Sequence, residues 1–422
     1  MVNSEGPCAR KGRHAATSPG CRDRSGFALV ITVVLLALLV LTLYALSALG
    51  RVGADISRSA AYQTQARQNA LIGLSSALGE LQRYAGNDAS ITGMAGLTGI
   101  PAGAGNSARH WCGVWDDNGQ FLHWLASGVS GPSIPTLSGT DSIALLATGA
   151  LGADGTDKEH VRVLIVPITS VGPAGSSVRH GGYAWWIGDE GVKLSAVVPD
   201  TEAPVTGEKH AINELIAALS PTAANLARVE SYDQLVFVPA TPLTPGQLQS
   251  NLHALARTHY GLVGTSLLAG RLNVNSTSAR YWRGLGATYN RLRPADQLVI
   301  SLTTFGDRMR DNLVGTASAG KAVGGPFLTV DAFLDSPLLE TALQGSGITP
   351  AEFRDAMQAW LCVRSDTFRI RAYGDAVNPA DPTRVEASAY CEAIVQRTSD
   401  ALPGFGRKFS VSYFRWLGPD DI

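Results

Sequence analysis

The sequence contains little charge, few cysteines and no excess of either sign of charge. Only 16% of its 422 residues are Asp, Glu, Lys or Arg, against roughly 25% in an ordinary soluble domain. The 34 basic residues balance 35 acidic ones, which excludes a dedicated electrostatic binder of nucleic acid, because such proteins need a basic excess. Five cysteines without a Cys-x-x-Cys pair exclude a disulfide scaffold and a zinc-finger-type site. Apolar residues, at 45%, still suffice for a sizeable core.

Common signatures of catalysis are also missing. Neither Gly-x-Ser-x-Gly nor His-Glu-x-x-His occurs, which removes two common hydrolase motifs. Gly315–Ala322 has the spacing of a phosphate-binding loop, but Ala322 replaces the Ser or Thr that holds Mg²⁺. The polar residues Arg308–Leu313 before it do not resemble the strand that such a loop follows. A flexible Gly/Ala loop is the favoured interpretation, and we expect neither enzyme activity nor a cofactor.

Three sets of residues would allow a binding function without requiring one. His110 and His123 flank a predicted hairpin and could meet as metal ligands, but ordinary surface or half-buried histidines are favoured. Asp116-Asp117-Asn118 and Asp189-Glu190 lack the alternating carboxylates of a calcium loop and are interpreted as turns. No metal site is therefore predicted. Core and sheet packing is the favoured use of seven tryptophans that could otherwise form a carbohydrate-binding face: Trp111, Trp115, Trp124, Trp185, Trp186, Trp282 and Trp416.

The strongest feature of the sequence is an apolar segment near its beginning. No charged residue occurs from Ser25 to Gly50, and the 23 residues Phe27–Leu49 are almost entirely apolar. A helix of that length rises about 35 Å, enough to cross a hydrocarbon core of about 30 Å. No second apolar run approaches this length, so we expect a single-pass topology with membrane lipid around residues 27–50.

The charges before the apolar segment predict its orientation. Residues 1–26 contain five Lys or Arg and two acidic residues. By the positive-inside rule the N-terminus then stays cytoplasmic and the rest of the chain is exported. The expected location is the inner membrane, with the C-terminal part in the periplasm or in an extracellular fibre.

Three interpretations of the first 50 residues remain open. The first is a secretory signal peptide cut near Ala45-Leu46-Ser47, although its apolar region would be long. The second is a plain signal anchor. The third is a prepilin-type leader, removed between Gly26 and Phe27 so that the apolar helix is retained; Arg24-Ser25-Gly26-Phe27 fits this case because a Gly-Phe pair stands at the junction of basic leader and apolar run.

A helical pattern continues beyond the apolar segment. Apolar residues recur at a spacing near 3.6 through 51–85, and no proline interrupts the 58 residues Phe27–Tyr84. One near-continuous helix of about 87 Å is predicted. Its first half would lie in a membrane or filament, and its amphipathic second half would pack on a globular head.

The exported region predicts an antiparallel sheet interrupted by helices, so the fold class is α+β. Residues 86–110 form a Gly/Ala-rich linker, 111–200 a β-rich head, 201–361 a helical insertion region and 362–422 a β-rich end. Hairpins are predicted around Asp117-Asn118-Gly119 and around residues 188–191, and a buried strand at Val161–Thr169. The remaining expected elements are helices at His210–Leu219, Thr222–Glu230, Thr244–Tyr260, Thr329–Leu343 and Thr349–Leu361, and strands at Thr367–Ala372 and Phe409–Arg415.

Three cysteines fall in the exported part, where the compartment is oxidising. Cys112, Cys362 and Cys391 allow one disulfide and one free thiol. Cys362 and Cys391 are the nearest pair and are the candidate disulfide, which would join the C-terminal strands.

The N-terminus resembles type IV pilin-like proteins, particularly minor subunits of the PilX and general-secretion K type. Several later segments resemble the pilin-like "cassette protein A" family of Verrucomicrobia: Gly181–Val198, Gly270–Leu285, Pro326–Leu334, Arg364–Val377, Cys391–Arg397 and Phe409–Ile422. The resemblance covers roughly residues 24–422 and implies a long pilin helix on a sheet head with helical insertions. It also implies cleavage and N-methylation at Phe27 after action of a prepilin peptidase, and other pilin-like subunits as partners.

The resemblance assigns a special meaning to Ile31. In major pilins the fifth mature position is a Glu, thought to pair with the terminal amine of a neighbouring subunit, and here that position is Ile31. The missing carboxylate favours a tip or initiating subunit in a pseudopilus-like fibre of a type II secretion or type IV pilus system. The alternatives are a signal-anchored exported enzyme and a membrane-anchored glycan-binding adhesin.

Overall fold

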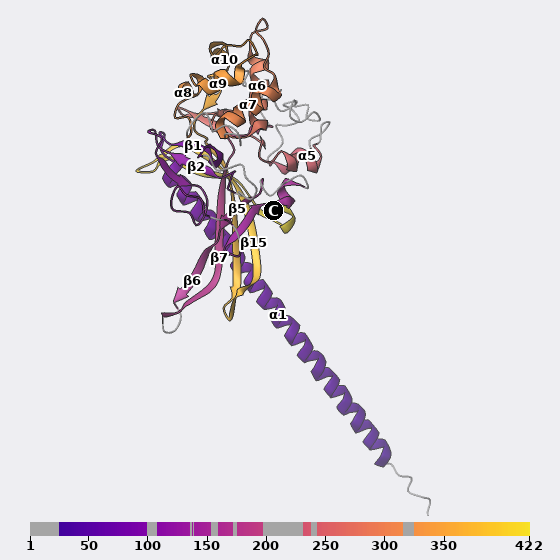
Figure 1. Cartoon of the computed structure of the whole chain (residues 1–422). Coiled ribbons are helices and arrows are strands. Elements are labelled where there is room, and N and C mark those ends of the chain that lie inside the picture. Colours follow the sequence, from indigo (N-terminus) through magenta and orange to yellow (C-terminus); the bar gives the residue numbers. More distant parts are fainter. Residues whose placement is uncertain are drawn as a thin grey trace, which may run out of the picture. The chain divides into compact units, whose positions relative to one another are not determined.

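A computed structural model describes residues 25–98, 108–135, 137, 139–152, 159–171, 175–196, 231–237, 243–314 and 325–422. The chain divides into two compact units, residues 1–60 and 61–422, and helix α1 (Ser25–Ala85, 61 residues) runs through the boundary (Figure 1). The long helix predicted from Phe27 to Tyr84 is confirmed. Residues 1–24, the helices expected at 210–219 and 222–230, and the Gly/Ala loop at 315–322 lie outside the described residues.

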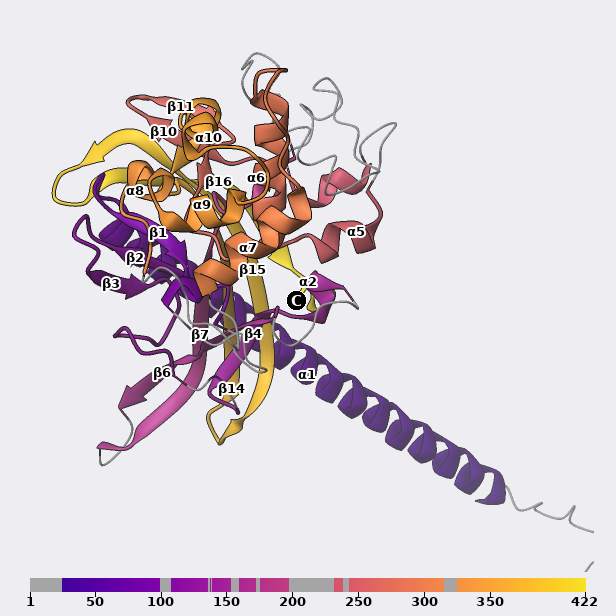
Figure 2. The ribbon, with the colours of Figure 1, turned by 45° about the horizontal axis from the view of Figure 1, so that its top comes forward.

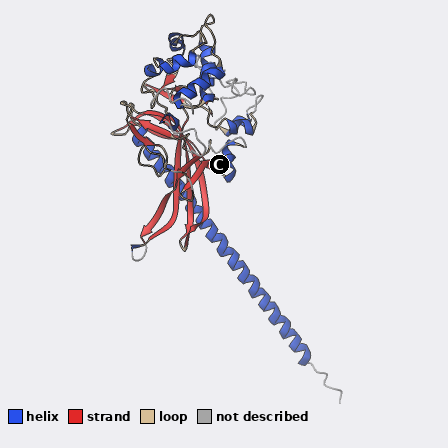
Figure 3. Ribbon diagram, viewed as in Figure 1, coloured by secondary structure: helices blue, strands red, loops and turns tan. Residues whose placement is uncertain are grey.

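The second unit is organised around a five-stranded antiparallel sheet (strands in Figure 3). Its strands are β6 (Val166–Val171), β7 (Ser177–Asp189), β14 (Thr367–Asn378), β15 (Asp381–Leu402) and β16 (Gly406–Leu417), in the spatial order β16-β15-β14-β7-β6. Neighbouring strands are consecutive in the chain except at the centre, where β7 pairs with β14. Residues 190–366 are therefore an insertion between two paired strands, and the predicted α+β class is confirmed.

One face of this sheet is covered by the second half of α1. Residues alternate between the two faces of a strand, and Phe368, Ile370 and Ala372 of β14 point to the helix with Cys391 and Val395 of β15. The helix meets them with a stripe of small and branched residues at spacings of three and four: Ala66, Ala70, Leu74, Ala77, Leu81 and Ala85. From Ala66 on, the amphipathic pattern predicted for 51–85 builds this interface, whereas Val52 and Ile56 of the same pattern are exposed.

Two small sheets precede the central one along the chain. Strands β1 (Ile91–Met94), β2 (Cys112–Trp115) and β3 (Phe121–Trp124) form the first, and β4 (Ser142–Leu146) and β5 (Val161–Leu164) form the second. The hairpin predicted at Asp117-Asn118-Gly119 joins β2 to β3, with Gly119 at a φ of 79° that a side chain would disfavour. Two short helical segments accompany them, the 3₁₀ helix η1 (Ala95–Thr98) and α2 (Thr148–Leu151).

Most helices of the insertion gather toward one end of the long strands of the central sheet (Figure 1 and Figure 2). Its helices are η4 (Asp233–Phe237), α5 (Pro245–Ser250), α6 (Ala279–Leu292), α7 (Leu302–Val314), α8 (Val330–Leu334), α9 (Pro337–Leu343) and α10 (Pro350–Met357). Its short strands are β8 (Leu194–Ser195), β9 (Leu255–Ala256), β10 (Tyr260–Val263), β11 (Ser266–Ala269), β12 (Leu272–Asn273) and β13 (Leu361–Cys362), and the chain ends on η5 (Pro419–Asp421). One core joins Trp282 and Phe333 of the insertion to Trp186 and Tyr373 of the sheet.

Several predicted elements differ from the structure. The hairpin at 188–191 is wrong, because Leu194 and Ser195 pair in parallel with Leu255 and Ala256 instead of folding back on β7. The strand at Val161–Thr169 divides at Ile165 into β5 and β6, and β6 is largely exposed because it is the edge of the sheet. Residues 91–98 of the predicted linker form β1 and η1.

Three predicted helices of the insertion fall on described residues; each begins where predicted and is shorter than predicted. Thr244 and Thr349 cap α5 and α10 in capping boxes followed by proline, as their sequences predict. The first of these helices ends at Ser250, so Thr244–Tyr260 is not one helix. The segment Thr329–Leu343 forms α8 and α9, because Ser336 and Pro337 begin a new helix.

Candidate functional site

The apolar half of α1 is the first candidate site. The large apolar side chains of Phe27–Leu49 are exposed, and the most apolar 18-residue window of the helix has a mean hydropathy of 2.9 with none of it buried. Two hydroxyls in this segment are satisfied inside the helix, since Thr32 donates to the carbonyl of Leu29 (2.9 Å) and Thr42 to that of Leu39 (2.8 Å). An exposed helix with internally satisfied polar groups suits a hydrocarbon environment. In the described part of the chain, α1 is the one helix that is both long enough and apolar enough to cross a membrane.

The residues of the predicted cleavage junction lie at the start of this helix. Gly26 and Phe27 are both within α1, and the Phe27 side chain is 74% exposed. Ile31, one turn further on, is 44% exposed and places an apolar side chain at the fifth position counted from Phe27. Cleavage between Gly26 and Phe27 and the role of Ile31 stay predictions.

The second half of α1 lies unusually close to the sheet. A Cβ atom added at Gly374 of β14 would lie 2.1 Å from the backbone nitrogen of Ala70 and 2.4 Å from the carbonyl oxygen of Ala66. Backbone atoms cannot rotate away as a flexible side chain can, so this position accepts only glycine. A Cβ atom added at Gly73 on the helix would lie 3.1 Å from the carbonyl oxygen of Ala184.

Amide side chains fix the register of α1 on the sheet. Asn69 donates to the carbonyl of Asp375 (2.6 Å) inside the interface. Near the end of the helix, Gln82 donates to the carbonyl of Arg407 (2.8 Å) and accepts from the backbone N–H of Phe409 (3.1 Å). These bonds reach β14 and the edge strand β16, so the second half of α1 is held by hydrogen bonds as well as by apolar contact.

A buried arginine closes the C-terminal end of α1. Arg397 of β15 is fully buried and donates to the carbonyl of Gly86 (2.8 Å), just beyond the last helical residue. A cation suits this end because the last carbonyls of a helix carry partial negative charge. The same guanidinium pairs with Asp88 (2.5 Å) and Asp366 (3.2 Å). Burial opposes ionisation of Asp88, but the contacts with Arg397 outweigh it and lower the pKa of this carboxyl.

The opposite face of the sheet contains a network of buried charges. Arg369 of β14 pairs with Glu190 (Nε–Oε1 3.0 Å) and with Glu392 (Nη1–Oε2 3.1 Å), and Arg371 pairs with Glu392 (2.8 Å). Lys193 adds a second cation to Glu190 at 2.5 Å. Burial opposes ionisation, but these cations keep the pKa values of both carboxyls below their ordinary range.

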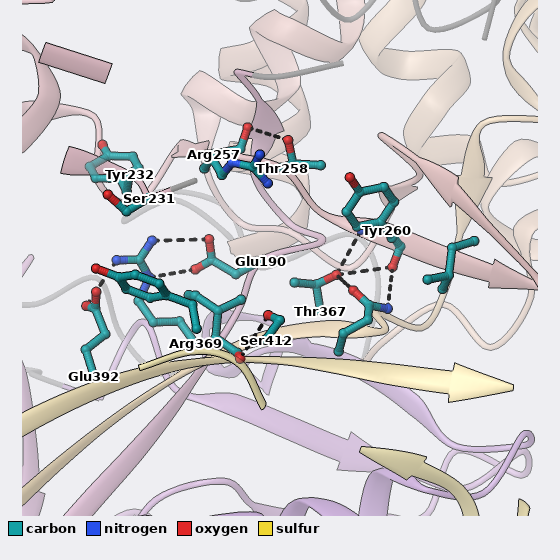
Figure 4. Close-up of a pocket in the computed structure, with 14 residues that line it drawn as sticks. Glu190, Ser231, Tyr232, Arg257, Thr258, Tyr260, Thr367, Arg369, Glu392 and Ser412 are labelled. Carbon is teal, nitrogen blue, oxygen red and sulfur yellow. Dashed lines mark hydrogen bonds and ion pairs between the residues drawn. The ribbon is translucent and has the colours of Figure 1, made fainter. Parts of the chain in front are cut away.

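This network forms one side of a pocket of about 340 Å³ (Figure 4). The labelled side chains show Arg369 between Glu190 and Glu392, with Tyr232 beside it; the guanidinium carbon lies 5.3 Å from the Tyr232 ring centroid. An acid–base catalyst needs groups whose pKa values approach the working pH. Here both carboxylates are ionised and saturated by cations, so the network joins the insertion to the sheet rather than supplying a general acid.

The other predicted sites are placed differently by the structure. His110 and His123 do not meet: His123 stacks on Tyr84 with ring centroids 4.5 Å apart, and His110 stacks on His253 at 3.6 Å. Of the seven tryptophans considered for a carbohydrate face, six are at most 4% exposed, and Trp416 is 39% exposed. The preference for packing is therefore confirmed, and those residues do not form an exposed aromatic platform.

The acidic residues considered as calcium ligands accept hydrogen bonds from nearby backbone N–H groups. Asp116 accepts from the backbone N–H groups of Asn118 (3.0 Å) and Gln120 (2.7 Å), which is turn geometry. Asp189 is buried; burial raises its pKa to about 6, and it accepts from the Gly191 N–H at 2.8 Å.

The expected disulfide is not formed in the structure. Cys112, Cys362 and Cys391 are all buried free thiols. Cys391 points into the core between α1 and the sheet, whereas Cys362 lies on β13 beside β12. Burial raises the pKa of both Cys362 and Cys391 to about 12, so neither is an activated nucleophile.

Comparisons with known proteins add little to these observations. No protein-family model matches the chain, and no curated protein matches it. A solved structure that is similar is the GspK-GspI-GspJ complex of the type 2 secretion system of enterotoxigenic Escherichia coli. The sequence identity is 15%, the alignment covers 60% of this chain and 83% of that chain, and the TM-score is 0.29. This TM-score is too low to show a shared fold, so the function proposed below rests on the chain's own residues.

Proposed function

We propose that this protein is a non-enzymatic, pilin-like minor subunit, inserted in the inner membrane as a prepilin and assembled into a type IV pilus-like or type II secretion-like fibre. One observation supports it above the others. A single helix begins at a Gly-Phe junction, is exposed and uncharged over Phe27–Leu49, and packs through its second half on an antiparallel sheet.

In the proposed mechanism the apolar helix first enters the lipid bilayer and later exchanges lipid for the helices of other subunits. With the basic leader held in the cytoplasm, residues 27–50 cross the bilayer and the remainder is exported. A prepilin peptidase then cuts between Gly26 and Phe27, and the helix leaves the lipid to pack against apolar helices of other pilin-like subunits. Each step uses the same exposed apolar surface, and residues 27–50 contain no charged side chain.

The N-terminus of the mature protein tests this proposal. Intact-mass and terminal-peptide mass spectrometry of protein from native membranes are expected to find a chain that starts at Phe27. Gly26→Val is expected to abolish cleavage, because a branched side chain replaces the glycine at the proposed site, whereas Gly20→Val within the same leader is the matched control and still yields Phe27. A wild-type chain starting near Ala48 would instead show a secreted protein, and an uncut chain a plain anchor; either result overturns the proposal.

The tip or initiating position is a further part of the proposal and depends on Ile31. If the absent carboxylate keeps the subunit out of the shaft, Ile31→Glu should raise the share of this protein found in sheared, purified fibres at the expense of the membrane fraction. Ile31→Gln has a similar size without the charge and should behave as wild type. Quantitative immunoblotting of both fractions measures the effect, and equal shares in all three proteins would remove the basis for the tip position.

A further inference from the structure

Three segments far apart in the sequence bring two histidines and a carboxylate together in the second unit. His110 precedes β2, Glu159 precedes β5 and His253 follows α5. One ligand atom from each lies within 4.8 Å of the other two. His110 Nε2 lies 2.8 Å from Glu159 Oε2, and the two imidazole rings stack with an interplanar angle of 8°.

The backbone around this cluster is held by buried indoles. Trp186 donates its ring N–H to the carbonyl of His110 (3.2 Å), and Trp111 donates to the carbonyl of Arg162 (3.1 Å), a few residues after Glu159. Both tryptophans are fully buried in the core. The segments bearing His110 and Glu159 are therefore fixed relative to each other, which is what a preorganised ligand set requires.

The two oxygens of Glu159 have different partners. Oε1 pairs with Arg109 at 3.4 Å, whereas Oε2 lies 2.8 Å from His110 Nε2. Metal binding would replace this Oε2–Nε2 hydrogen bond and the stacking of the two rings, and would leave the Arg109 pair in place.

A backbone carbonyl orients His253, and the cluster has space around it. His253 Nε2 lies 2.8 Å from the backbone carbonyl of Glu159, and a metal-binding imidazole commonly donates its other N–H to such a carbonyl, which fixes the tautomer. The cluster lies in a pocket of about 350 Å³ that is also lined by Arg280 and Arg310. A metal ion binds in the plane of each imidazole, so the stacked rings must turn, and the pocket supplies the space.

We propose that His110, Glu159 and His253 form a site for a single divalent transition-metal ion of the zinc type, with one coordination position open to this pocket. Two imidazoles and one carboxylate are a common zinc ligand set, and an open site binds water or an anion as fourth ligand. Ligand atoms of a tetrahedral zinc ion lie about 3.4 Å apart at metal–ligand distances of about 2.1 Å. On binding, the widest separation in the cluster, which is within 4.8 Å, would shorten, and the 2.8 Å between His110 Nε2 and Glu159 Oε2 would lengthen. Calcium is disfavoured, because it prefers oxygen ligands.

A cobalt titration of the full chain in detergent, purified without a histidine tag and treated with chelator, tests this site. Co²⁺ is expected to bind with a stoichiometry of one per chain, give the visible absorption of a four-coordinate ion, and be displaced by Zn²⁺. His253→Gln and Glu159→Gln should each weaken cobalt binding by more than about 100-fold. Loss of a residue that only orients a metal ligand costs up to about 100-fold in affinity, and loss of a ligand itself should cost more.

His123→Gln is the matched control, because His123 is also a half-buried, ring-stacked histidine with a carboxylate nearby, Glu80 at 3.9 Å. It should bind cobalt as the wild type does. Thermal unfolding separates lost ligands from lost folding: Zn²⁺ should raise the midpoint of wild type and His123→Gln, and leave that of the two site variants unchanged, since only a bound ligand stabilises the native state. No binding by wild type, or equal binding by all four proteins, would overturn the proposal.

Discussion

Gly374→Ala is expected to destabilise the protein by about 3 kcal/mol or more, at the large end of single substitutions. The added Cβ would lie 2.1 Å from the Ala70 nitrogen and 2.4 Å from the Ala66 oxygen, so α1 would have to move off the sheet. Overpacking against side chains costs roughly 1–3 kcal/mol, and here the obstacle is helix backbone.

Gly79→Ala makes the same change on the helix itself and is the matched control. Nothing lies within 4 Å of a Cβ built at Gly79, and alanine is favoured over glycine inside a helix by roughly 0.5–1 kcal/mol. The two substitutions should therefore shift stability in opposite directions. Urea titration of the full chain in detergent, followed by tryptophan fluorescence, measures both, because Trp185 lies in the helix–sheet core. Equal midpoints would show that α1 does not lie on β14 as described.

The second large effect is expected for Glu392→Gln, at about 3–5 kcal/mol of destabilisation, as found when one partner of a buried ion pair is removed. Glu392 is 2% exposed and bonds to Arg369, Arg371 and Arg415. The neutral amide would leave Arg371 without a carboxylate, although Arg369 keeps Glu190 and Arg415 keeps Asp233. Its N–H₂ would also face the guanidinium groups as a further donor.

Asp331→Asn supplies the control for a lost carboxylate. Asp331 also pairs with an arginine, Arg354 at 2.6 Å, but its side chain is 76% exposed, and exposed pairs contribute about 0–1 kcal/mol. Urea midpoints at neutral pH should thus fall strongly for Glu392→Gln and little for Asp331→Asn. Similar losses for the two variants would show that burial does not determine the strength of the Glu392 pairs.

Glu392 also makes the stability of the protein depend on pH. The cations around Glu392 hold its pKa below the ordinary value of 4.5 in the folded protein. A carboxyl with a lowered folded-state pKa contributes stability that is complete above the unfolded pKa and is lost as the pH falls below it. Wild type should therefore lose stability steeply below about pH 4.5, and Glu392→Gln should show a shallower slope there.

The sequence predicted those elements whose cause is local. The long helix was predictable because Phe27–Tyr84 contains no proline, and its apolar half contains no charge. The starts of α5 and α10 were predictable because a capping threonine and a first-turn proline act within one turn. The hairpin at Gly119 depends on a short local turn, in which the Gly119 N–H donates to the carbonyl of Asp116, and was equally accessible.

Elements that depend on distant partners were missed. Helix α6 contains Gly284 and Gly286, whose absent side chains make room for Leu194 and Phe305 and whose helix propensity is low. Its Ser278 cap and its one-sided apolar pattern were nevertheless local signals that could have identified it. Leu194 and Ser195 look like the return strand of a hairpin until their partners, sixty residues away, are known. Likewise no spacing rule joins His110 to Glu159 and His253; their proximity follows from how β2, β5 and α5 pack, and His123 was the nearer candidate in sequence.

The order of β7 and β14 has a consequence for how the chain can mature. Much of the surface on which α1 packs is made by β14, β15 and β16, which all lie within residues 367–417; β7 contributes Trp185 and Ile187. A ribosome releases the helix long before those strands exist, and contacts of such sequence separation form slowly. Until the last strands are synthesised, the face formed by Ala66, Ala70 and Leu81 lacks the partners that β14, β15 and β16 supply. Loss of these C-terminal strands would therefore expose an apolar face close to the other end of the chain.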